Sequence, residues 1–173
     1  MIYETPRLFT REMTYDDLPA LARMLQDAEV MTAYEHAFSD AETRQWLQRQ
    51  IDRYQQYGHG LWAVILKESG CMIGQCGLTY QECDGREVLE IGYLFEKAYW
   101  HQGYAMEAAA GCKQYAFEQL HAPEVYSIIR DNNFASMNVA IRNGMTVRGR
   151  IIKHYYGMDM PHYVFCVKNP NTP

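Results

Sequence analysis

Apolar residues near the start of the chain recur with the spacing of a helix. The residues at i, i+3, i+4 and i+7 are Leu18, Leu21, Ala22 and Leu25. This spacing predicts an amphipathic helix within residues 14–34. Because proline is tolerated only in the first turn of a helix, Pro19 sets the predicted start at Asp16 or Asp17.

A second helix is predicted to follow directly. Ser39 and Glu42 have the spacing of a capping box, and Gly58 and Gly60 provide the stop. The pattern then changes to short apolar runs that end at turn residues, as expected for strands. Helical spacing returns over residues 105–120, where the buried face is rich in small side chains.

The predicted order of elements is β-α-α-β-β-β-α-β-α-β-β. The strands are expected near residues 8–13, 61–66, 71–80, 88–95, 125–129, 146–156 and 162–168. The last helix is expected over residues 134–143, with Asn133 as its cap and Gly144 as its stop. This mixed order predicts an α+β fold in one domain, residues 1–173, with a mostly antiparallel sheet and one βαβ crossover that makes two central strands parallel and splayed.

Composition excludes several classes of protein. The chain has 16 Lys and Arg against 21 Asp and Glu, a formal net charge of -5, so nucleic acid is not expected as a partner. No apolar run is long enough to span a membrane, and no signal peptide is visible at the start. Five cysteines without a C-x-x-C spacing indicate reduced thiols and a cytoplasmic protein.

Residues 89–108 carry the first chemical signal. A predicted strand runs into a turn that contains Gly103 and opens into a helix. The first N–H groups of a helix lack partners and carry positive partial charge, so this turn suits an anion such as a pyrophosphate. One glycine before a helix is more often an ordinary turn. The G-x-G-x-x-G and P-loop patterns are absent, which argues against Rossmann and P-loop folds.

The next predicted strand ends in a second polar turn. Asn133 lies there, after residues 125–130. It is either a simple helix cap or an amide donor to a ligand between the two parallel strand ends.

Taken together, these segments resemble the GNAT superfamily of acyl-CoA-dependent N-acetyltransferases. The branch that the chain resembles is that of the ribosomal-protein N-terminal (alanine and serine) acetyltransferases. The segments that carry the resemblance are residues 4–8 (E-T-P-R-L), 91–93 (I-G-Y), 99–108 (Y-W-H-Q-G-Y-A-M-E-A), 133–136 (N-F-A-S) and 142–145 (R-N-G-M).

The resemblance implies acetyl-CoA as the acyl donor, lying between the two splayed strands. The residues implied in pairing with the pantetheine through their backbones are Tyr93, Leu94 and Phe95. The residues implied in holding the pyrophosphate are His101, Gln102, Gly103, Tyr104, Ala105 and Met106. Asn133 and Asn138 are implied on the pantetheine side. Many family members carry a tyrosine acid at the position of Ala140, and in the resembled branch Ser136 is the candidate instead.

Acetyl transfer needs a base for the amine, a donor to the thioester oxygen and a proton for the leaving thiolate. Ser136 is the predicted acid, unless its hydroxyl bonds its own helix. Glu90, before an expected bulge, is the predicted base, unless it is an edge charge paired with Arg or Lys. A backbone N–H near Tyr93 and Leu94 is the predicted oxyanion donor. Glu107 is interpreted as a first-turn acid.

The late strands hold a second polar cluster. If their turn centres on Met158, His154 and His162 are cross-strand neighbours. No third ligand has metal spacing, so a metal is not predicted; the cluster is either a wall around an acceptor amine or an exposed hairpin. The segment around Tyr34 is a candidate cover for that site.

The predicted activity is therefore acetyl transfer to a primary amine, of a protein N-terminus or of a small molecule. The acidic net charge mildly favours a cationic acceptor. Two alternatives stay open: a non-catalytic acyl-CoA-binding or regulatory module on the same fold, and an interaction domain without CoA binding. The chain is expected as a monomer or a homodimer.

Overall fold

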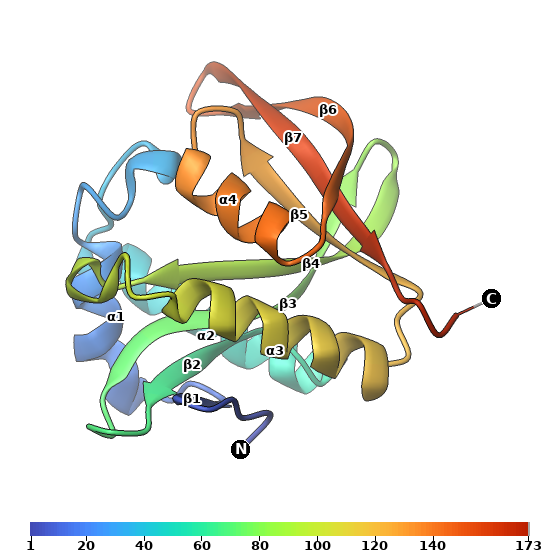
Figure 1. Ribbon diagram of the computed structural model, residues 1–173. Coiled ribbons are helices and arrows are strands. Elements are labelled where there is room, and N and C mark those ends of the chain that lie inside the picture. The colour runs from blue at the N-terminus through green and yellow to red at the C-terminus, as the bar shows by residue number, and fades with distance from the viewer. Residues whose placement is uncertain (173) are drawn as a thin grey trace.

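Seven strands form one mixed sheet in the order β1-β2-β3-β4-β5-β7-β6 within residues 1–172, the part of the chain that this computed structural model describes. The strands are β1 (Leu8–Arg11), β2 (Leu61–Leu66), β3 (Met72–Cys83), β4 (Arg86–Phe95), β5 (Glu124–Arg130), β6 (Thr146–Tyr155) and β7 (Met158–Lys168). In this described part of the chain only β4 and β5 pair in parallel, and α3 connects them (Figure 1). The predicted α+β fold and order of elements are confirmed.

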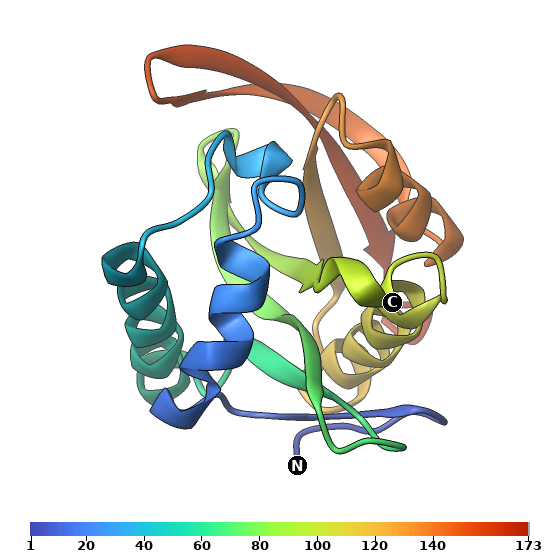
Figure 2. The same cartoon turned by 90° about the vertical axis from the view of Figure 1, so that its left-hand side faces the viewer.

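Helices cover both faces of the sheet. They are α1 (Leu18–Leu25), α2 (Asp40–Tyr57), α3 (Tyr104–Glu118) and α4 (Phe134–Arg142). Figure 2 shows α1 and α2 on one side of the sheet and α3 and α4 on the other. Among residues 1–172 the buried apolar side chains form three clusters. One contains Leu21, Leu47 and Ile65 beneath α1 and α2, and a second contains Ala108 and Phe165 beneath α3 and α4. A smaller third cluster includes Val88 and Val164.

The helix caps follow local sequence. The Ser39 hydroxyl accepts the Glu42 N–H, and the Glu42 carboxylate accepts the Ser39 N–H, so the predicted capping box is confirmed. Gly58 ends α2 in the left-handed conformation. The first helix differs from its prediction: residues 15–17 form a 3-10 turn, and α1 begins only at Leu18, because the Asp17 side chain turns back to accept the Thr14 N–H.

The β3–β4 ladder has no bulge. Its register runs without a shift from Gly74 opposite Phe95 to Cys83 opposite Arg86, so the bulge expected after Glu90 is not found there. Close approach of the backbones explains a glycine in β3: a Cβ on Gly77 would overlap the carbonyl oxygen of Gly60.

The β6–β7 hairpin turns earlier than predicted. Tyr156 and Gly157 both have positive φ and form the turn, which is the backbone of a type I′ hairpin. His154 therefore lies opposite Asp159, and His162 lies opposite Ile151. The prediction that the two histidines are cross-strand neighbours is wrong.

Candidate active site

A cavity of about 480 Å³ lies where β4 and β5 separate. Its walls come from these two strands, the start of α4, the inner face of α2, the α1–α2 connection and the β6–β7 hairpin. The connection and the hairpin meet at its rim, where the rings of His36 and Tyr156 lie 5.1 Å apart and Arg130 forms an ion pair with Glu35. As expected, the segment around Tyr34 forms part of this cover.

Side chains, rather than main-chain ladder bonds, join the two strands at the point of separation. Glu90 opposite Tyr126 is the last parallel pair. The Glu90 carboxylate accepts the Ile128 N–H at 2.9 Å, and the buried Ser127 hydroxyl donates to the Ile91 carbonyl at 2.9 Å. Within residues 1–172, the main-chain groups of β4 that face β5 beyond Ile91 have no β5 partner, so they remain available to an extended ligand.

The cavity connects the two faces of the sheet. Cross-strand partners share a face, so Glu90 lies with Thr79, and Leu94 with Gln75, on the side of α1 and α2. Tyr93 alternates to the other side and packs in the core beneath α3 and α4. A donor on one face and an acceptor on the other therefore meet between β4 and β5.

Glu90 is a partly buried carboxylate without an ion pair in the part of the chain described here. Burial is the main cause that raises its pKa, and the Ile128 N–H, Lys153 and Arg53 oppose that shift. The interpretation of Glu90 as an edge charge paired with Arg or Lys is therefore wrong. A carboxylate with a raised pKa in a cavity has the properties of a general base.

Ser136 is placed by the cap of α4. The Asn133 side-chain oxygen accepts the Ser136 N–H at 3.2 Å, which confirms the cap, and both residues line the cavity. Among residues 1–172 the Ser136 hydroxyl makes no hydrogen bond, so it does not bond its own helix as the alternative required.

Tyr93 also contributes its side chain, although the sequence analysis considered only its backbone. Its hydroxyl donates to the Ser136 carbonyl at 2.8 Å and so joins β4 to α4 across the gap. Burial raises its pKa well above the ordinary range, so the phenol stays protonated. Ala140, at the position of the family's tyrosine acid, is buried in the core and offers no donor.

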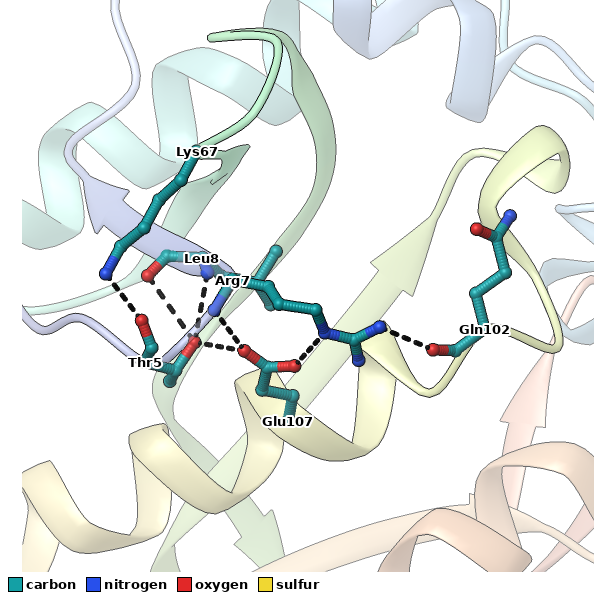
Figure 3. Close-up of polar contacts among 6 residues, drawn as sticks. All are labelled: Thr5, Arg7, Leu8, Lys67, Gln102 and Glu107. Atoms are coloured by element: carbon teal, nitrogen blue, oxygen red, sulfur yellow. Dashed lines mark hydrogen bonds and ion pairs between the residues drawn. The ribbon is translucent and has the colours of Figure 1, made fainter.

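The turn before α3 has the backbone expected of an anion site. His101 and Gly103 both have positive φ, and Gly103 caps the helix. The N-terminal segment fixes this turn from outside (Figure 3): Arg7 Nη1 donates to the Gln102 carbonyl at 3.0 Å, and Arg7 Nε donates to Glu107 at 2.6 Å. Glu107 lies in the first turn as predicted, and it also accepts from the Thr5 hydroxyl at 2.6 Å.

The predicted site residues fall into two groups. Those that line the cavity are Glu90, Tyr93, Leu94, Asn133 and Ser136. Those outside it are Phe95, His101, Gln102, Gly103, Tyr104, Ala105, Met106 and Asn138. Of the late cluster, Tyr155, Tyr156 and His162 line the cavity, whereas the exposed His154 pairs with Asp159.

Several residues that line the cavity are not among those predicted from the sequence. They are Gln75 on β3, Arg49 and Arg53 on α2, Arg130 on β5 and Lys153 on β6. Only the helical spacing of Arg49 and Arg53, four residues apart on a predicted amphipathic helix, gave any sign that they share a face.

Within residues 1–172, no group of three His, Cys, Asp or Glu side chains is placed to hold a metal ion. No helix in this range is long and apolar enough to cross a membrane.

Comparison with known proteins agrees with this geometry. The family model described as an acetyltransferase (GNAT) domain matches residues 7–146. An uncharacterized Bacillus subtilis protein, YkkB, is 35% identical over 142 residues, which cover 82% of this chain and 83% of that protein.

Solved structures share the whole fold. A GNAT-family acetyltransferase from Bacillus anthracis superposes with a TM-score of 0.83 at 22% identity, covering 96% of this chain and 98% of its own. RimL, a ribosomal L7/L12 α-N-protein acetyltransferase solved in complex with coenzyme A, has a TM-score of 0.78 at 19% identity and covers 95% of each chain. Members of this family use acetyl-CoA as co-substrate. The family-model match over residues 7–146 and the 35% identity to YkkB show that the chain belongs to the GNAT acetyltransferase family.

Proposed function

We propose that this protein transfers an acetyl group from acetyl-CoA to a primary amine, by direct attack while both substrates are bound. The observation that carries the proposal is the separation of β4 and β5 beyond Glu90, inside a cavity that connects both faces of the sheet. This separation leaves unpaired backbone groups of β4 for the acyl donor, and it leaves the Glu90 carboxylate for the acceptor amine.

The residues present fit acetyl-CoA. Tyr93, Leu94 and Phe95 follow the last parallel pair and offer backbone groups to the amides of the pantetheine. The Asn133 carbonyl oxygen is used by the cap of α4, which leaves its NH₂ group to donate to the same arm. The turn from His101 to Met106 offers N–H groups and a helix N-terminus to the pyrophosphate, and the exposed Asn138 is the weakest of these assignments.

Acetyl-CoA supplies the activated acyl group and a thiolate as the leaving group. Glu90 takes the proton from the amine as the N–C bond forms and the C–S bond breaks. Ser136 donates its hydroxyl proton to the sulfur and regains one from solvent. A backbone N–H near Leu94 donates to the thioester oxygen, a contribution commonly worth about 3 kcal/mol.

One observation favours a second candidate. Ala140 takes the place of the family's tyrosine acid and is only 1% exposed, so α4 lacks that group. If Ser136 does not replace it, the fold is a non-catalytic acyl-CoA-binding module.

Calorimetric titration tests the donor site, with acetyl-CoA and CoA as ligands and NADH and ATP as controls. Selective binding of the first two supports both candidates, and release of free CoA thiol with an amine present then distinguishes transfer from binding alone. Absence of binding to both CoA ligands would refute the two candidates and leave the interaction domain.

A further inference from the structure

The cavity is lined by more positive than negative side chains. Four cationic residues line it, namely Arg49, Arg53, Arg130 and Lys153, whereas Glu90 is the only carboxylate among the described lining residues. Arg130 is compensated by Glu35. Within residues 1–172 the other three cations form no ion pair. The cavity thus has the opposite charge to the acidic chain as a whole.

These cations surround Glu90 from two directions. Arg53 on α2 and Lys153 on β6 both lie close enough to lower the pKa of Glu90, although burial outweighs them. Burial is the main cause that lowers the pKa of the Arg53 guanidinium. Arg49, one helical turn before Arg53, adds to this shift, and Glu90 and Tyr57 oppose it. An anion bound between α2 and β6 would relieve this repulsion.

A neutral donor points to the same ligand chemistry. Gln75 is 1% exposed and lines the cavity. Its Oε1 accepts from the Trp46 indole N–H at 3.0 Å, and because an indole N–H can only donate, this contact fixes which end of the amide is oxygen. The Gln75 NH₂ group is left buried without a partner, so it is free to donate to a ligand.

We infer that the acceptor is a small primary amine that also carries a carboxylate, a deepening that rests on the proposed function. Apart from Glu90, the charged side chains that line the cavity are cations, and the buried Gln75 NH₂ group is a donor without a partner, so these groups favour a ligand with acceptor oxygens. The amine lies at Glu90, and the carboxylate lies toward Arg53 and Lys153, the two cations that act on Glu90. Gln75 lies four residues further along the sheet, opposite Leu94, where its NH₂ group can donate to another acceptor oxygen in the cavity. A cavity of about 480 Å³ has the size of a small-molecule site. Polyamines are disfavoured by the same cations.

The test compares amines that differ in the group beside the nitrogen. Alanine carries a carboxylate beside the amine, alaninamide carries a neutral amide in its place, and ethylamine carries neither group. The other compounds tested as acceptors are aminomethylphosphonate, spermidine and a peptide with a serine–aspartate N-terminus. CoA release at fixed pH and saturating acetyl-CoA gives kcat/KM for each. The amine of alaninamide is less basic than that of alanine, so at the same pH a larger fraction of it is deprotonated and able to attack. This difference favours alaninamide, so it cannot produce the expected preference for alanine.

The expected kcat/KM for alanine exceeds that for alaninamide by at least about tenfold. Lys153→Gln should reduce this ratio and Lys153→Arg should restore it. Arg148→Gln is the matched control, because Arg148 is an exposed cation of the same strand that does not line the cavity; it should leave the ratio unchanged.

Other outcomes separate the inference from the proposed function. If acetyl-CoA binds but the acetyl group is transferred only to alaninamide, ethylamine, spermidine or the peptide, the inference alone is overturned. The same holds if acetyl-CoA binds and none of the tested amines is acetylated. Preference for the phosphonate over every carboxylate overturns the choice of carboxylate. Failure of acetyl-CoA to bind overturns the proposed function, and the inference with it.

Discussion

Arg7 contacts Glu107 through two separate donors. Its backbone N–H donates to Oε1 at 2.8 Å, and its side-chain Nε donates to Oε2 at 2.6 Å. The remaining guanidinium holds the Gln102 carbonyl and lies 4.3 Å from the centroid of the Tyr104 ring. One residue of the N-terminal segment thereby fixes both sides of the turn that we assign to the pyrophosphate.

Arg7→Ala should weaken CoA binding about threefold to tenfold, because the loop loses the contacts that hold its backbone in place. The loss of stability should be only about 1 kcal/mol, since the Arg7 side chain is 45% exposed. Calorimetry and thermal unfolding measure the two effects. Arg23→Ala, which removes the exposed pair with Glu96, is the control. Unchanged CoA affinity in Arg7→Ala would show that the contact serves stability alone.

Glu90→Gln should lower kcat/KM about a hundredfold or more, the usual range for loss of a general base. The amide oxygen still accepts the Ile128 N–H, so the strands keep their geometry. The acid side of the pH–rate profile, which the wild-type carboxylate should set above the ordinary Glu range, should disappear in the variant. A wild-type rate in Glu90→Gln would remove Glu90 from the mechanism.

The same variant should be more stable than the wild type near pH 7. A raised pKa means that the folded state binds this proton more tightly than the unfolded chain does. Below the pKa of Glu90 in the unfolded chain, the carboxyl is protonated in both states and does not destabilise the fold. Its destabilising effect on the folded wild type grows as the pH rises toward and through the pKa of the folded state. The gain in Tm of Glu90→Gln should therefore vanish near pH 4, about the unfolded value. A Tm difference independent of pH would contradict this account.

Ser136→Ala should slow transfer at least about tenfold while it leaves CoA affinity and Tm unchanged. The hydroxyl makes no hydrogen bond within residues 1–172, so its loss exposes no partner. Ser127→Ala provides the contrast, because it removes a buried bond to the Ile91 carbonyl and should cost about 1–2 kcal/mol of unfolding free energy. Unchanged turnover in Ser136→Ala would exclude Ser136 as the acid.

Gly77→Ala should destabilise the protein by about 3 kcal/mol or more, because the added Cβ overlaps the Gly60 carbonyl in a packed sheet. Gly149→Ala is the matched control, since a Cβ there meets nothing within 4 Å. Denaturant unfolding measures both. Equal stability of the two variants would show that β2 and β3 separate easily.

The sequence by itself determined the order of the elements and those of their ends that local caps define. The Ser39 and Glu42 box, the Gly58 stop and the Asn133 cap are local interactions between residues a few positions apart, so their spacing alone identifies them. The strand, turn and helix around Gly103 were identified for the same reason, and the resemblance to the family rested on this segment together with others along the chain.

The tertiary structure alone decided which charged side chains line the cavity. Arg53 and Lys153 meet around Glu90 although 100 residues separate them, and no local pattern encodes such a meeting. The register of the β6–β7 hairpin placed His162 in the cavity and His154 outside it. Because successive side chains of a strand alternate between faces, a small error in the predicted turn changes which residues face each other, and only the observed pairing corrects it.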